Sequence, residues 1–163
     1  MIAIVGEDAD DILYFKTKMS LTTTVKLFGN VEAYVGTLSK ENAVVCAFGR
    51  SNYLSSMLMA IILKQYQPYL VFNVGTCSSF SPQLKQGDLL IADHYYFSAV
   101  DFTSEHAGLY GQIPGMNPFY VADSSLNDKI ESVAYLLANR YVQRGYLLSG
   151  ECFYMDEAPL QAI

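Results

Sequence analysis

Two stretches of the sequence bring together side chains that are suited to chemistry. The first is an acidic group directly after Gly6, and its members are Glu7, Asp8, Asp10 and Asp11. Carboxylates suit the first turn of a helix, because they offset the positive end of the helix dipole. The alternative interpretation is that one of these carboxylates points across the end of the preceding strand into a site. Both interpretations remain open at this point.

The second stretch is a turn of small residues, Gly75–Ser79, between two apolar runs. The run before it, Tyr69–Val74, is predicted to be the central strand of the sheet and to be buried on both faces, as strands of parallel sheets are. A turn after such a strand lies at its carboxyl end, where open α/β sheets bind their ligands. Its small side chains let backbone N–H groups approach an anion or a sugar hydroxyl.

The other reactive side chains are scattered along the chain. Cys46, Cys77 and Cys152 have no metal-binding spacing and are predicted to be buried, reduced thiols. Cys77 lies inside the small-residue turn, but no neighbouring His or Lys in the sequence would activate it, so it is interpreted as inert. His94 and His106 are interpreted as surface or loop residues rather than catalysts.

The composition favours one globular domain over residues 1–163. Half of the residues are apolar (52%) and only 16% are charged, which argues against a disordered chain. The net charge of −6 argues against a nucleic-acid surface, which needs a basic patch. The N-terminus lacks the basic stretch of a signal peptide, and the longest apolar run, Met57–Leu63, is too short to span a bilayer. We therefore expect a cytoplasmic protein with no nucleic-acid or membrane partner.

The spacing of apolar residues predicts the elements that position these side chains. The predicted strands are Ile2–Val5, Val25–Phe28, Val31–Val35, Ala43–Phe48, Tyr69–Val74, Leu89–Val100 and Val142–Leu148. The predicted helices run from the acidic group to about Met19, from a cap at Ser51 or Asn52 to Tyr66, and over Ser124–Tyr141 with Ser124 or Ser125 as its cap. The last helix has the apolar stripe Leu126, Ile130, Val133, Leu136 and Leu137. This alternation predicts an α/β fold, a mixed β-sheet flanked by helices.

Four motifs occur in a fixed order along the chain. They are Asn73-Val74-Gly75-Thr76-Cys77-Ser78-Ser79-Phe80, Leu84-Lys85-Gln86-Gly87-Asp88, Gly111-Gln112-Ile113-Pro114-Gly115 and Ser149-Gly150-Glu151-Cys152-Phe153. With these motifs, and with its first six residues as the first strand, the chain resembles the nucleoside phosphorylase superfamily over almost its whole length. Within that superfamily it is most similar to the bacterial 5′-methylthioadenosine/S-adenosylhomocysteine nucleosidases.

The resemblance implies a reaction, which is hydrolysis of the N-glycosidic bond of a purine nucleoside with release of adenine. Water is the nucleophile, and no cofactor or metal takes part. Such a reaction passes through an oxocarbenium-like sugar, so an acid protonates the leaving purine while a carboxylate activates water. The resemblance also implies a role in methionine salvage and nucleoside catabolism, and a homodimer.

The resemblance assigns roles to single residues of this chain. Asp11 stands where the family places its water-activating Glu. Thr76 stands where a hydroxyl contacts the water or the sugar. Cys77 follows it in the same substrate-binding turn. Phe153 stands where the family stacks its purine, and Tyr154 stands where backbone groups read the purine edge.

The long loop of residues 101–119 has a role in the family as well. It reaches into the pocket of the neighbouring subunit, so Tyr110, Ile113 and Pro114 are expected to form an apolar wall for a thioalkyl group. The alternative is a loop that is packed on the protein's own surface.

Three departures from the family pattern bear on the expected activity. Asp11 is one methylene shorter than the family's Glu, and small misplacements of a catalytic group reduce the rate strongly. Ser78 and Ser79 replace two glycines of the usual turn. The chain stops at Ile163, before the family's ribose-binding Met-Glu pair and its purine-protonating Asp, so the fold is expected to lack the last strand and helix. We therefore expect weak or no activity from this chain.

Two alternatives to a nucleosidase remain. One is a non-catalytic paralogue that still binds purine nucleosides. The other is a purine nucleoside phosphorylase, in which Arg50 after Gly49 would hold phosphate. No second Arg follows the turn at Gly75, and the segment 112–115 resembles the nucleosidases, so the nucleosidase is favoured over the phosphorylase.

Overall fold

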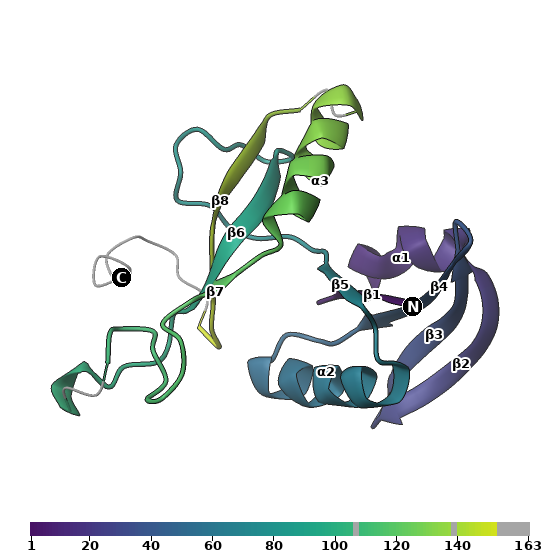
Figure 1. The fold of residues 1–163 in the computed structure, drawn as a ribbon, viewed down its shortest axis with the longest axis horizontal. Coiled ribbons are helices and arrows are strands. Elements are labelled where there is room, and N and C mark those ends of the chain that lie inside the picture. The colour runs from purple at the N-terminus through teal and green to yellow at the C-terminus, as the bar shows by residue number, and fades with distance from the viewer. Residues whose placement is uncertain (106–107, 138–139, 153–163) are drawn as a thin grey trace. The chain divides into compact units, whose positions relative to one another are not determined.

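The computed structural model describes residues 1–105, 108–137 and 140–152, and it leaves the side chain of Leu137 undescribed. The chain forms two compact units, Met1–Cys77 and the residues from Ser78 onward, and each is described by itself (Figure 1). The expectation of a single domain stays a prediction. Among the described residues, no helix is long and apolar enough to cross a membrane.

The first unit consists of a mixed sheet and two helices. Its elements are β1 Ile2–Gly6, α1 Ala9–Lys18, β2 Ser20–Phe28, β3 Val31–Leu38, β4 Glu41–Ala47, α2 Asn52–Tyr66 and β5 Leu70–Asn73. The strand order is β2-β3-β4-β1-β5. β1 pairs in parallel with β4 and β5, whereas β2, β3 and β4 pair antiparallel. The expected hairpin is confirmed, and Gly29 takes a positive φ of 55° at its turn.

Both faces of this sheet are covered by a helix, as Figure 1 shows. Successive side chains of a strand point to opposite faces, so β1 contributes to two separate cores. Ala3 and Val5 belong to one buried cluster with Leu58 and Ile62 of α2. Ile4 belongs to a second buried cluster that includes Ile12 of α1, Met19 and Val45. The predicted α/β class, with a mixed sheet flanked by helices, is therefore confirmed.

The prediction that Tyr69–Val74 forms the central strand is wrong for the sheet of this unit. β5 stands at the end of the strand order, beside β1, and its Val71 is 36% exposed. The physical reason is that β1 pairs on both sides, with β4 and with β5, so the interior positions go to β1 and β4. The residues Ala43, Val44, Val45 and Cys46 of β4 are each at most 1% exposed.

The second unit consists of a smaller sheet and one longer helix. Its elements are β6 Leu89–Phe97, a short 3₁₀ helix over Thr103–Glu105, β7 Tyr120–Val121, α3 Ser124–Leu137 and β8 Val142–Ser149. The strand order is β7-β6-β8, with β6 and β8 parallel and β7 antiparallel to β6. α3 covers one face of this sheet through a core of Ile91, Ala134 and Val142, to which Ile130 adds.

Two details of α3 differ from the sequence prediction. The helix is capped by Asp123 rather than by Ser124 or Ser125, because Asp123 Oδ1 accepts a hydrogen bond of 2.9 Å from the backbone N–H of Leu126. The expected apolar stripe is also rotated. Val133 is 52% and Leu136 84% exposed.

The buried face of α3 contains a polar residue, which explains the rotation of the stripe. Asn127 is 7% exposed, and its side-chain amide donates to the carbonyl of Ala92 and to Asp93 Oδ1 at 2.9 and 3.0 Å. Asp93 also accepts hydrogen bonds from Arg144. Because Asn127, Ile130 and Ala134 follow helical spacing, this polar anchor turns that face toward the sheet and moves Val133 outward.

Candidate active site

Asp11 lies just after the end of β1, in the first turn of α1. Gly6 ends the strand, Asp8 is the N-cap of α1, and Asp11 occupies the third position of the helix. In this capping-box arrangement, Asp11 Oδ2 accepts hydrogen bonds from the backbone N–H groups of Glu7 at 3.0 Å and of Asp8 at 2.8 Å. The Asp11 carboxylate is half-buried and is held in one orientation by its own helix start.

Two glycines give the Asp11 side chain its space. A Cβ on Gly6 would lie 2.8 Å from Asp11 Cβ, and a Cβ on Gly75 would lie 3.3 Å from Asp11 Oδ2. The exit of β5 is tied to β1 by a hydrogen bond of 2.9 Å from the backbone N–H of Val74 to the carbonyl of Val5. The structure thus brings Asp11 next to the small-residue turn, at the carboxyl edge of the parallel strands.

The turn continues with Thr76 and Cys77, both of which are exposed. They follow Gly75 directly, so the predicted hydroxyl stands one residue beyond the glycine that faces Asp11. The carboxylate and the start of the turn, which the sequence placed about 65 residues apart, therefore meet at one edge of the sheet, as open α/β sheets place their ligand sites.

Arg50 is part of the same edge, in a role other than the one considered from the sequence. Its guanidinium binds two carboxylates, with 3.1 Å between Nε and Glu7 Oε1 and 2.6 Å to Asp8 Oδ2. The hydrogen bond to Asp8, and next the negative charges of Asp8 and Glu7, raise the pKa of Arg50 above its ordinary value. A guanidinium that two carboxylates neutralise is a poor phosphate ligand, so this geometry does not favour the phosphorylase alternative.

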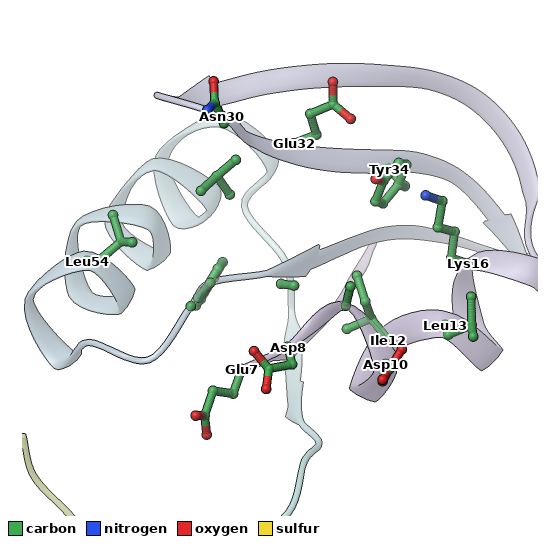
Figure 2. A pocket seen from close by; sticks show the side chains of 15 residues that line it. Glu7, Asp8, Asp10, Ile12, Leu13, Lys16, Asn30, Glu32, Tyr34 and Leu54 are labelled. Carbon is green, nitrogen blue, oxygen red and sulfur yellow. The ribbon is translucent and has the colours of Figure 1, made fainter.

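A pocket of about 400 Å³ lies on another side of the α1 helix start (Figure 2). Its lining combines apolar residues with carboxylates, and Figure 2 shows Lys16 of α1 pointing toward Tyr34 of β3. The Lys16 Nζ atom lies 3.8 Å from the centre of the Tyr34 ring, a cation–π contact. Asp10 lines this pocket whereas Asp11 does not, so the two neighbouring carboxylates face different surroundings.

The predicted loop residues belong to the second unit. The Tyr110 hydroxyl donates a hydrogen bond of 3.0 Å to the carbonyl of Ser98, and the N–H of Gly111 donates one of 2.8 Å to the carbonyl of Val100. Ile113 is 38% exposed, and Pro114 is exposed as well. The loop is thus fastened beyond the end of β6 and presents two apolar side chains at its surface.

The remaining predicted site residues, Phe153 and Tyr154, lie outside the residues that the structure describes, and so does His106. His94 is half-buried and lies in a strand, so it is not a loop residue. It lies in β6 with its ring 5.0 Å from Tyr146 and 5.3 Å from Phe119, because the face of the sheet away from α3 carries an aromatic group.

The prediction of three buried thiols is correct only for Cys46. Burial of Cys46 in β4 raises its pKa to about 12, and its thiol donates to the carbonyl of Glu32. Cys77 and Cys152 are exposed. The reason is that Cys46 lies on an interior strand, whereas the other two lie in or after turns at strand ends.

The comparison with known families now adds to this geometry. A family model described as the phosphorylase superfamily matches residues 1–162. The chain belongs to this superfamily. The match runs through both compact units, so the two units together form the region that is characteristic of the superfamily, and the resemblance carried by the four motifs is confirmed.

Similar proteins narrow the relationship. The 5′-methylthioadenosine/S-adenosylhomocysteine nucleosidase of Anoxybacillus flavithermus is 31% identical over 157 residues, which cover 96% of this chain and 67% of that protein. The corresponding nucleosidase of Geobacillus thermodenitrificans is 29% identical, and the match covers 94% of this chain and 64% of that protein. The chain thus spans about two thirds of the length of these relatives.

Solved structures share the fold. The nucleosidase of Neisseria meningitidis in complex with methylthio-immucillin-A superposes with a TM-score of 0.90 at 23% identity, covering 99% of this chain and 69% of that one. The prediction of a nucleoside phosphorylase-like fold is therefore confirmed.

Sequence reasoning missed the groups that hold Asp11. These are the backbone amides of Glu7 and Asp8. It also missed the ion pairs that Arg50 forms with the side chains of the same two residues. The spacing of acidic residues at the helix start signals the capping box. No local signal pairs Arg50 with residues more than 40 positions earlier, because that pair depends on the parallel register of β1 and β4.

Proposed function

We propose that the chain is a nucleosidase that hydrolyses the N-glycosidic bond of 5′-methylthioadenosine or S-adenosylhomocysteine and releases adenine. The observation that carries this proposal is the Asp11 carboxylate, oriented by two backbone N–H groups beside Gly75 at the carboxyl edge of the parallel strands. The 31% identity to the A. flavithermus nucleosidase supports the choice of substrate. Water is the second substrate, and the reaction requires no redox or group-carrier cofactor.

Asp11 acts as the general base in this proposal. Both of its described hydrogen bonds end on Oδ2, so Oδ1 is the oxygen that takes a proton from the attacking water. The water adds to the sugar carbon as the bond to the purine breaks. The bonding electrons leave with the purine, which takes a proton from solvent and becomes adenine. The Thr76 hydroxyl, after Gly75 in the turn, contacts the water or the sugar, and Cys77 adds a wall of the sugar site.

The purine and the thioalkyl group are assigned to other parts of the chain. Phe153 stacks on the purine and the backbone of Tyr154 reads its edge, in accordance with the family pattern. Tyr110, Ile113 and Pro114 form the apolar wall for the thioalkyl group in the neighbouring subunit of a homodimer. The exposure of Ile113 and Pro114, on a loop fastened by Tyr110, supports this assignment. We place the enzyme in the cytoplasm, in keeping with its unpaired cysteines.

We expect slow turnover from these 163 residues. Asp11 has a shorter reach than Glu, and Ser78 and Ser79 stand in the turn in place of glycines. The chain also matches only about two thirds of the relatives' length. Any group that the relatives place in the remaining third is missing from an assay of these residues.

The test is adenine release from 5′-methylthioadenosine at high enzyme concentration, in buffers with and without phosphate. The proposal predicts slow release at the same rate in both buffers, with methylthioribose as the sugar product. Release that requires phosphate and gives a sugar phosphate would show a phosphorylase. No release in either buffer, with adenine binding detected by calorimetry, would leave the non-catalytic binding protein.

A further inference from the structure

We propose that Arg50 is a positioning residue for Asp11, acting through the Glu7–Asp8 segment, and this inference rests on the proposed function. Glu7 and Asp8 link β1 to α1, and each contributes to two sets of contacts. Their backbone N–H groups donate to Asp11 Oδ2, whereas their side chains bind Arg50. A single guanidinium therefore holds both residues that orient the carboxylate.

The linking segment needs such a holder because its charges repel one another. Four carboxylates occur within five residues, and Asp11 must keep its orientation beside those of Glu7 and Asp8. Like charges this close oppose the compact helix start unless a cation lies between them. Arg50 supplies that cation at 3.1 Å from Glu7 and 2.6 Å from Asp8.

The conformation of the segment points the same way. Asp8 has extended backbone angles, φ −109° and ψ 164°, so it lies outside the helix as its N-cap, and its carbonyl accepts a hydrogen bond of 3.2 Å from the N–H of Asp11. Arg50 comes directly after Gly49, whose positive φ of 84° turns the chain at the end of β4. That turn brings the guanidinium to the end of the neighbouring β1 strand.

A competing explanation is that backbone bonds alone hold the segment. The N–H of Gly49 donates to the carbonyl of Glu7 at 2.8 Å, and the N–H of Phe48 donates to that of Gly6 at 2.9 Å. If these two bonds suffice, removing the Arg50 side chain leaves the Asp11 contacts unchanged. The two explanations therefore differ in a measurable way.

The deciding experiment measures amide hydrogen exchange at Glu7 and Asp8 by NMR in the full 163-residue chain. We expect Arg50→Met to accelerate exchange at these two amides roughly threefold, in keeping with the modest strength of exposed ion pairs. Arg50→Lys, whose ammonium is a point charge rather than a planar fork, is expected to fall between Arg50→Met and wild type. The control is Lys40→Met, which removes an exposed cation from the turn between β3 and β4. Arg50→Met exchange equal to wild type at Glu7 and Asp8 would overturn the proposal.

A second experiment tests whether the ion pairs of Arg50 affect catalysis. Where wild type releases adenine, Arg50→Met is expected to lower kcat about threefold with KM unchanged, because Arg50 orients the base and does not touch substrate. A higher KM with kcat unchanged would contradict the positioning role. If wild type releases no adenine, the proposed function fails, and the amide measurement still decides whether Arg50 positions Asp11.

Discussion

At the scale of single residues, the position of the Asp11 carboxylate depends on two neighbouring glycines, which have no side chain, and on two backbone amides. Gly6 and Gly75 leave room that even a Cβ would fill, and the amides of Glu7 and Asp8 then fix the carboxylate. A catalytic base needs this combination of free space and fixed orientation, because water must reach the carboxylate at a defined angle.

Gly75→Ala tests the role of that space. The added methyl group would lie 3.3 Å from Asp11 Oδ2, a tight contact that displaces the carboxylate or the turn. We expect adenine release to fall about tenfold, since displacement of a catalytic group by a fraction of an ångström has a large effect on rate. The thermal midpoint should barely change, because Gly75 is exposed.

The matched control for this substitution is Gly145→Ala on β8. There the new methyl group meets the flexible end of the Leu90 side chain rather than a site carboxylate. An equal loss of activity in both variants would mean that the space beside Asp11 has no special role.

Cys46 gives a second prediction at this scale. Its pKa is raised to about 12 by burial, so at neutral pH a thiol reagent should modify the exposed Cys77 and Cys152 and spare Cys46 until the chain unfolds. The raised pKa also means that stability falls as pH rises from 9 toward 12, because the unfolded chain ionises its thiol first. Rapid labelling of all three thiols in the folded chain would contradict this account, and Cys46→Ala should flatten the pH dependence.

At the scale of elements, local patterns located most helices and strands but not their partners. The hairpin at Gly29, the cap at Ser51 and the separate strands β6 and β8 all carry local or periodic signals. The edge position of β5 does not, because it depends on β1 pairing with two strands at once. The buried face of α3 was predicted wrongly for a related reason. Asn127 is polar, so the sequence pattern places it on the exposed face, but its amide is buried and donates hydrogen bonds to Ala92 and Asp93.

Asp123→Ala tests the corrected start of α3. Asp123 accepts hydrogen bonds from the N–H of Leu126 and the hydroxyl of Ser125, and these bonds lower its pKa below the ordinary value of 3.8. We expect the thermal midpoint to fall by about 2–4 °C, as for loss of a helix cap in a chain of this size.

The cap should also depend on pH. A carboxyl whose pKa is lowered by folding stabilises the folded state above its unfolded value, and this contribution is lost as pH falls below about 3.8. Ser124→Ala is the control, since Ser124 was one of the two caps expected from the sequence. A larger loss of stability in Ser124→Ala than in Asp123→Ala would show that the cap is misassigned.

At the scale of the whole molecule, the family match covers residues 1–162, although the chain forms two compact units with the boundary after Cys77. The predicted site residues divide in the same way, with Asp11, Thr76 and Cys77 in the first unit and Tyr110, Ile113 and Pro114 in the second. The sequence alone therefore identified the family, and the assignment of the site residues stays a prediction. The proposed roles of Tyr110, Ile113 and Pro114 require contacts with substrate, which local patterns do not encode.

The most direct test of the central claim compares Asp11→Asn with Asp10→Asn in the adenine-release assay, at enzyme concentrations that make slow turnover visible. Both substitutions remove one carboxylate from the first turn of α1, but Asp11 faces Gly75, whereas Asp10 lines the pocket shown in Figure 2. We predict that Asp11→Asn lowers release about 100-fold or more, as expected for loss of a general base, and that Asp10→Asn stays close to wild type. Release by Asp11→Asn at the wild-type rate would contradict the account.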